Sequence, residues 1–165
     1  MKSHFFLNLL TLSIPLSKTT MGQNDATIEE TVDFLKSKLT RTTAEKTVTI
    51  EFDKKSCQLI KVTYINETQI KEQAYIPLNK IDPSRIEIFQ PKGSNIVKLD
   101  INILNDQELI KYVQTYKSGS VKDTFYDNWE TFVFDEISLQ NNIPERVKKA
   151  FIHAIKLCGG VNEKF

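Results

Sequence analysis

The sequence predicts an α+β domain: a strongly bent antiparallel sheet, or a partly open barrel, of about seven strands between an N-terminal helix and a C-terminal capping helix. Three observations predict it. Apolar residues recur every three to four positions near both ends of the chain, as in amphipathic helices. From residue 47 onward, apolar and polar residues alternate, as in half-buried strands. The loops between these segments are only a few residues long, which favours antiparallel neighbours because parallel crossovers are much longer.

The C-terminal helix is expected from Pro144 to Cys158. Asn142 is a candidate N-cap with Glu145 three residues later, and Pro144 occupies the first turn, where its missing N–H costs nothing. Gly159 can end the helix in the left-handed region. We expect this helix to cover the sheet with an apolar stripe made of Val147, Ala150, Phe151, Ala154, Leu157 and Cys158.

A second amphipathic helix is expected over residues 27–39. Thr27 and Glu30 form the pattern of a capping box at its start. Its apolar positions are spaced for packing on the body of the domain, although docking on a partner is an alternative. These positions are Ile28, Val32, Leu35 and Leu39.

The strands are expected at residues 47–52, 57–65, 70–78, 86–89, 96–104 and 109–116, with a last strand best placed at 130–137. Alternation also predicts which side chains face the core. The core-facing positions are Val48, Ile50 and Phe52, then Ile60, Val62 and Tyr64, then Ala74 and Ile76, then Val97, Leu99, Ile101 and Ile103, and finally Ile110, Tyr112 and Tyr116.

Residues 74–81, with the sequence AYIPLNKI, read as a strand followed by an irregular segment. With the order of seven strands and one terminal helix, this pattern resembles a pleckstrin-homology-like roll over residues 47–158. The resemblance implies a fold and carries no family motif. Lys54-Lys55 is the only basic pair in the first hairpin, where phosphoinositide-binding members have theirs, so the resemblance implies no function.

Residues 1–22 are typical of a secretory signal peptide. A short basic lead precedes an apolar run over residues 5–16, which Pro15 interrupts. We expect cleavage before Gln23 and export of residues 23–165 as one periplasmic or extracellular domain, with no stable membrane span afterwards. Retention of the segment as an anchor is the alternative.

Composition excludes several functions. The chain carries 22 basic and 21 acidic side chains without a basic cluster, which argues against nucleic acid as a partner. His153 is the one histidine after residue 22, so we expect a surface position, no multi-histidine metal site and no cofactor. The acidic segment from Asp123 to Glu136 lacks the pattern of a calcium loop, and no metal is expected there.

Three large aromatic residues, Phe125, Tyr126 and Trp129, fall in a segment expected to be a polar loop. Large rings in such a place indicate contact with a protein partner or a small apolar ligand. The other interpretation, which we favour, is that they pack beneath the N-terminal helix.

Cys57 and Cys158 are the two cysteines. Export would permit a disulfide between them. Cys57 is in phase with Leu59, however, and not with Ile60 and Val62, which the alternation places in the core. We therefore favour two buried free thiols over the bridge.

Two functions remain. The first is an exported, non-catalytic binding module, which the scarcity of histidine favours. The second is a small carboxylate-dependent hydrolase or isomerase with a pocket in the curved sheet. A cavity lined by several strands and holding a buried carboxylate would favour the enzyme.

Overall fold

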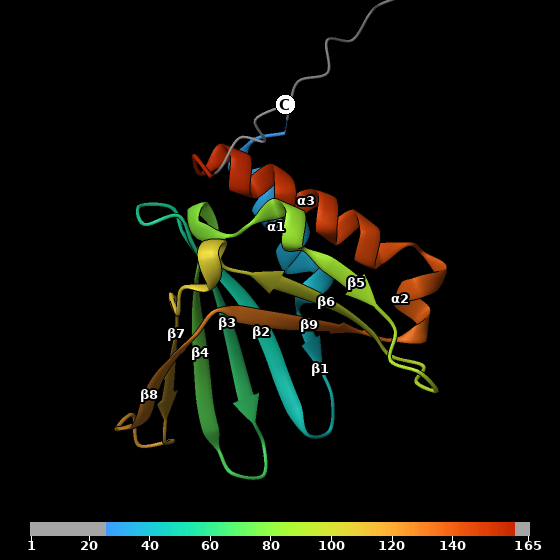
Figure 1. Cartoon of the computed structure of the whole chain (residues 1–165). Helices are drawn as coiled ribbons and strands as arrows, with labels where there is room; N and C mark the ends of the chain where they lie inside the picture. The colour runs from blue at the N-terminus through green and yellow to red at the C-terminus, as the bar shows by residue number, and fades with distance from the viewer. Residues whose placement is uncertain (1–25, 161–165) are drawn as a thin grey trace, which may run out of the picture.

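The computed structural model describes residues 26–160, which form two antiparallel sheets with two long helices at one end (Figure 1). The predicted α+β class is confirmed. Among these residues, six strands form the larger sheet, in the order β1-β2-β3-β4-β7-β8, and three form the smaller one, in the order β5-β6-β9. The strands are β1 (Arg41–Thr42), β2 (Lys46–Asp53), β3 (Gln58–Ile65), β4 (Ile70–Pro77), β5 (Glu87–Phe89), β6 (Val97–Asn102), β7 (Ile110–Thr115), β8 (Val121–Asp127) and β9 (Trp129–Phe134).

The connectivity departs from a simple meander after β4. Strand β4 pairs next with β7, while β5 and β6 join β9 in the smaller sheet. Two short 3-10 helices, η1 (Leu78–Lys80) and η2 (Pro83–Arg85), lead from β4 to β5, and a third, η3 (Leu104–Asp106), precedes β7. Within the described residues, the edge strands β1 and β8 do not pair with each other. The larger sheet is therefore open and does not form a closed barrel.

Two of the nine strands in the described range have no counterpart in the sequence prediction. Strand β1 is only two residues long. Strand β8 lies at the sheet edge with nearly all of its side chains exposed, so its sequence shows no apolar alternation. Phe125 and Tyr126 consequently lie in a strand and not in a loop. The predicted last strand ends earlier than residue 137 because Asp135 caps a short helix, α2 (Glu136–Gln140).

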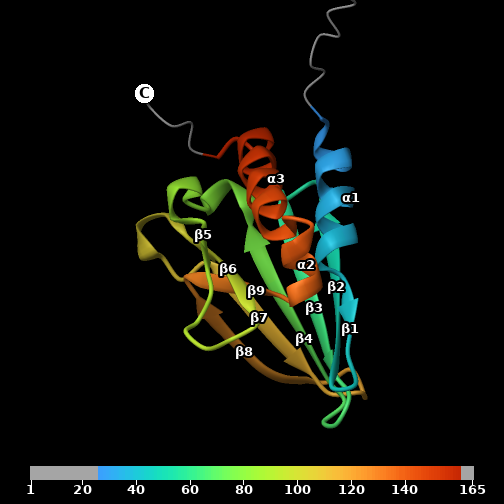
Figure 2. The ribbon, with the colours of Figure 1, turned by 90° about the vertical axis from the view of Figure 1, so that its right-hand side faces the viewer.

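The two long helices, α1 (Ile28–Leu39) and α3 (Ile143–Leu157), lie side by side across one end of the sheets (Figure 2). The capping box of α1 is present, with Glu30 N–H donating to Thr27 Oγ1 over 3.2 Å. Asn142 is the N-cap residue of α3, but its side chain makes no capping bond. Asn142 instead adopts the left-handed conformation, with φ of 52°.

The core lies between the helices and both sheets. Phe151 of α3 is fully buried, and its ring centroid lies 5.3 Å from that of Phe132 on β9. The predicted stripe of α3 holds except at Leu157, which is exposed. The main members of the core are Leu35, Leu59, Ile76, Leu78, Leu99, Ile101, Ile103, Ile110, Phe132, Val147, Phe151, Ala154 and Ile155.

Strand β3 turns the opposite face to the core from the one predicted. Leu59 is fully buried in the core, and alternation then places Lys61 and Thr63 on the same face. Ile60, Val62 and Tyr64 lie on the other side of the sheet, where Val62 is still buried, with 1% of its surface exposed. The apolar alternation misled the prediction because polar side chains occupy inward positions on this strand. We call the side of the larger sheet that carries Leu59 and Lys61 its inner face.

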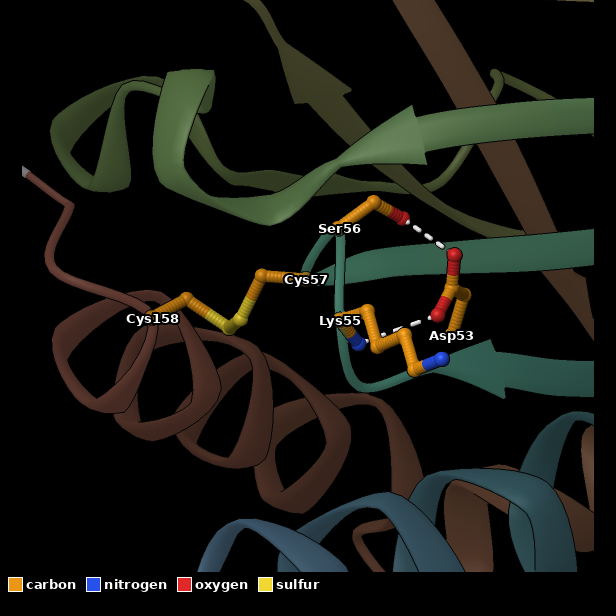
Figure 3. Close-up of a disulfide and its surroundings, with 5 residues drawn as sticks. All are labelled: Asp53, Lys55, Ser56, Cys57 and Cys158. Carbon is orange, nitrogen blue, oxygen red and sulfur yellow. Dashed lines mark hydrogen bonds between the residues drawn. A yellow bond between two sulfur atoms is a disulfide. The ribbon is translucent and has the colours of Figure 1, made fainter.

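Cys57 and Cys158 form a disulfide, with a Cα–Cα distance of 5.9 Å (Figure 3). The favoured interpretation of two free thiols is therefore wrong. The prediction failed because it assigned the wrong face of β3 to the core. Leu59 faces the core beneath α3, and Cys57 lies on that same side. The adjoining turn is held by Asp53, whose carboxylate accepts bonds from the Ser56 hydroxyl at 2.6 Å and from the Lys55 N–H at 3.0 Å.

Residues 1–22, the predicted signal peptide, lie outside the described residues. From residue 26 to residue 160, no helix has the length and apolar character needed to cross a membrane.

Candidate functional site

A cavity of about 440 Å³ opens on the inner face of the larger sheet, where β9 of the smaller sheet runs across it. Both sheets contribute to its wall. The lining residues are Leu39, Arg41, Lys46, Val48, Lys61, Thr63, Ile65, Glu72, Tyr112, Phe125, Asp127, Trp129, Glu130, Thr131, Phe132 and Val133.

The inner face changes from apolar to polar in two steps along the strands. The row nearest the helices pairs Leu59 with Ile76, both fully buried. The next row holds Ile50, Lys61, Ala74, Tyr112 and Phe125 in consecutive cross-strand pairs. The third holds Val48, Thr63, Glu72 and Gln114. Charged groups therefore begin directly beside the core, at the floor of the cavity.

The unpaired edge of β9 faces this floor. The even-numbered residues of β9 direct their backbone N–H and C=O groups toward β6. The adjoining bond from Ile103 N–H to Asn128 O, 2.8 Å long, establishes this alternation. The odd-numbered residues consequently direct their backbone groups toward the cavity. Donors from the larger sheet satisfy three of these carbonyls: Tyr112 Oη to Trp129 O at 3.1 Å, Lys61 Nζ to Thr131 O at 3.2 Å, and Arg41 Nη1 to Val133 O at 2.8 Å.

Glu130 is the buried carboxylate at the centre of this arrangement, with only 6% of its surface exposed. Its Oε1 accepts bonds from Lys61 Nζ at 2.7 Å and from the Thr131 N–H at 2.8 Å. Its Oε2 lies 3.2 Å from the Tyr112 hydroxyl, which is shared with the Trp129 carbonyl. Three donors thus surround one carboxylate, which is how a buried charge is stabilised.

Tyr112 serves as a hydrogen-bond donor in this cluster. Burial raises the pKa of its hydroxyl well above the ordinary value, and the negative charge of Glu130 raises it further. The hydroxyl therefore keeps its proton at neutral pH. The ring stacks on Phe125 with centroids 4.8 Å apart and planes 2° from parallel, which fixes the position of Phe125 at the cavity.

The structure brings two of the three predicted aromatic residues to the cavity. Phe125 is 38% exposed and Trp129 is 46% exposed, and both line it. Tyr126 is 53% exposed and points to the opposite face of β8, as alternation along a strand requires. All three rings are exposed, so the favoured interpretation, that they pack beneath the N-terminal helix, is wrong.

Sequence reasoning missed the charged members of the site, above all Lys61, Glu130 and Arg41. One signal was available for Glu130, which shares the phase of Phe132 and Phe134 in the predicted last strand. A carboxylate in a core phase indicates a buried polar partner. No comparable signal marks Arg41, because its role depends on the position of β9.

His153 lies away from the cavity, with Nε2 2.7 Å from the carbonyl oxygen of Ala26 beside α1. In the part of the chain that the structure describes, no three His, Cys, Asp or Glu side chains are grouped so that they could hold a metal ion.

The fold and site define an α+β protein of two antiparallel sheets with a charged, aromatic-rimmed cavity between them. No family model matches this chain, and no significant match was found among curated proteins or solved structures.

Proposed function

We propose that this protein is a non-catalytic binding module whose cavity binds a small ligand with a planar apolar part and polar groups. One observation carries the proposal: half-exposed Phe125 and Trp129 stand beside a cavity whose polar floor is already internally bonded. Ligand sites typically combine aromatic walls with a few fixed polar groups. The exposed ring of Phe125, held in place by stacking on Tyr112, also loses little freedom when a ligand binds.

A small carboxylate-dependent enzyme is the second candidate, because the cavity does hold a buried carboxylate, Glu130. A general base must have a free lone pair directed at the substrate and a pKa near the working pH. Glu130 instead accepts bonds from the Lys61 ammonium group, a backbone N–H and Tyr112. Tyr112, with its raised pKa, is equally unsuited to act as a base. This arrangement favours binding over catalysis.

Export of the protein is part of the proposal. The disulfide Cys57–Cys158 is compatible with an oxidising compartment, where such bonds persist, and the apolar run over residues 5–16 supports a signal peptide. Mass spectrometry of exported protein should find a chain beginning at or within a few residues of Gln23. An intact Met1 in that fraction would contradict the proposal.

The pleckstrin-homology-like resemblance stays a prediction about the fold. Ligand binding in the cavity does not depend on it, because Phe125, Trp129 and Glu130 act through their own positions.

Trp129 is the single tryptophan of the chain, so its intrinsic fluorescence reports directly on the mouth of the cavity. We would screen small aromatic compounds for a saturable change in this signal. Phe125→Ala should then weaken binding at least about tenfold, which corresponds to about 1.4 kcal/mol.

Tyr126→Ala is the matched control, since this ring belongs to the same strand and lies on its other face. It should change affinity less than about twofold. Equal losses in the two variants, or no compound that moves the Trp129 signal, would overturn the proposed function.

A further inference from the structure

The turn between β1 and β2 holds two cations at one end of the cavity. Arg41 and Lys46 flank this turn, and both line the cavity. Thr43 fixes the backbone of Lys46: its N–H and hydroxyl donate to Lys46 O at 2.8 and 3.2 Å, and its hydroxyl accepts from Lys46 N–H at 3.1 Å. Asn66 ties the turn to the next hairpin through bonds of 2.9 Å to the carbonyls of residues 44 and 45. The two cations therefore project from a fixed support.

The charges around the cavity are unevenly distributed. Lys61 is neutralised by Glu130, but among the side chains that the structure describes neither Arg41 nor Lys46 forms an ion pair. The other carboxylates of the lining, Glu72 and Asp127, belong to β4 and β8, on the far side of the inner face from the β1–β2 turn. The β1–β2 end of the cavity is therefore positive and the β4–β8 end negative.

Arg41 keeps donors available. Its Nη1 contacts the Val133 carbonyl, which leaves other guanidinium N–H groups for a second partner. Asp135 lies within the electrostatic influence of Arg41. Its pKa is lowered mainly by the Ser138 hydroxyl at 2.7 Å and the Ser138 N–H at 2.9 Å, which both donate to Oδ1, and the charge of Arg41 lowers it further. A second cavity of about 530 Å³ also shares Arg41, Lys46 and Val133, and it adds one further cation, Lys98, and one carboxylate, Glu45. The two cavities therefore share Arg41 and Lys46 in their walls.

We infer that Arg41 and Lys46 form an anion-binding end of the cavity, and that the ligand is an elongated amphiphile carrying a carboxylate or another anionic oxygen group. The inference rests on the proposed function. The aromatic mouth at Trp129 and the cationic end at Val133 are four residues apart on β9, or about 13 Å at the rise of a strand. The ligand therefore places its planar part between Phe125 and Trp129 and its anion beside Arg41.

A matched pair of probes tests this inference. 1-Pyrenebutyrate carries a carboxylate on a short chain from a large planar ring, and its primary amide has nearly the same size without the charge. Both probes quench tryptophan by energy transfer, so titration of the full-length protein can be followed through Trp129. The carboxylate should bind at least about tenfold more tightly than the amide, because its bonds to Arg41 are charge-assisted. Raising the salt concentration should reduce this preference.

Three variants locate the anion. Arg41→Gln should abolish most of the preference for the carboxylate. Lys46→Gln should reduce it a few-fold, with the fold intact because Thr43 bonds to the backbone of residue 46 and not to its side chain. Lys111→Gln is the charge-matched control, an exposed cation on the outer face of β7, and it should leave both affinities unchanged.

The outcomes separate the two proposals. Equal binding of acid and amide, or equal effects of Lys46→Gln and Lys111→Gln, would overturn the anion site while leaving ligand binding supported. Failure of both probes to quench Trp129 would overturn both.

Discussion

The inner face of the larger sheet has two halves that differ in what covers them. Under α1 and α3, the side chains of Leu59, Ile76 and Ile110 are fully buried and apolar. One step along the same strands, under the edge of β9, Lys61 and Tyr112 take their place. A helix satisfies its own backbone and presents only side chains to the sheet, whereas an unpaired strand edge presents carbonyl oxygens that need donors. The covering element therefore determines the chemistry of the face beneath it.

The two halves should also differ in how much each contributes to the stability of the domain. Apolar burial under the helices contributes free energy in proportion to the area covered. The ion pair under β9 contributes little net stability, because the cost of removing two charges from water offsets their attraction. The helix-covered half should therefore hold the domain together, and the ligand site that we propose lies in the half under β9, which contributes less to stability.

The largest expected effect comes from the disulfide, which links the end of α3 to the turn between β2 and β3. The bond joins residues separated by 101 positions, and closing a loop of that length stabilises a domain by about 4–5 kcal/mol in the chain-entropy model. Cys57→Ser should lower the free energy of unfolding by about that amount in urea melts, and reductant should then have no further effect. A thiol reagent should label neither cysteine in denatured, unreduced wild-type protein; labelling of both would contradict the bridge.

The next effect concerns the side chain at the centre of the same half. Phe151→Ala removes a fully buried ring and should destabilise the domain by about 3–5 kcal/mol. His153→Ala, two residues away on the flank of α3, should cost less than about 0.5 kcal/mol. Denaturant melts compare the two variants directly. If both cost the same, α3 does not hold the sheet in the way we describe.

The half under β9 should respond differently, through charge pairing. Lys61→Met leaves Glu130 buried without its ammonium partner and should cost about 3–5 kcal/mol. The double variant Lys61→Met/Glu130→Leu removes both charges and should lie within about 1 kcal/mol of wild type. Chemical denaturation of the single and double variants decides the matter. A double variant as unstable as the single one would show that the pair itself stabilises the fold.

Much of the fold could be predicted where local chemistry sets the structure. The capping box at Thr27, the stripe of α3 and the alternation of β2, β4 and β6 are all local patterns. The pairing of β4 with β7 and of β6 with β9 joins segments far apart in sequence, and no local pattern encodes it. Such pairings depend on which apolar faces meet in the folded core.

The site was predictable only in part for a related reason. Phe125 and Trp129 stood out as large rings among polar residues, and both line the cavity. Lys61 looked like the solvent side of β3, because Ile60 and Val62 next to it have the composition of a core face. Its inward position is explained by a bond to a backbone carbonyl of β9, and this carbonyl comes within reach only when the two sheets pack together. The disulfide was missed for the same reason. Cys57 lies on the side of the sheet that carries Lys61, and the sequence pattern had assigned that side to solvent.

The smallest effect tests the Tyr112 hydroxyl, which links the larger sheet to β9. Tyr112→Phe keeps the ring stacked on Phe125 but removes the donor to Glu130 and the Trp129 carbonyl, and should cost about 1 kcal/mol near neutral pH. In the folded protein, burial and the charge of Glu130 raise the pKa of Tyr112 above its ordinary value of 10.0. An unfolded chain loses this proton near pH 10, so the stabilisation is fully present below that pH and is lost as pH rises further toward the folded pKa. Urea melts should therefore show the wild type losing its advantage over Tyr112→Phe between about pH 10 and pH 12. A constant difference between the two proteins across that range would mean that the hydroxyl is not held as a buried donor, and that the cavity floor is more open to water than its contacts indicate.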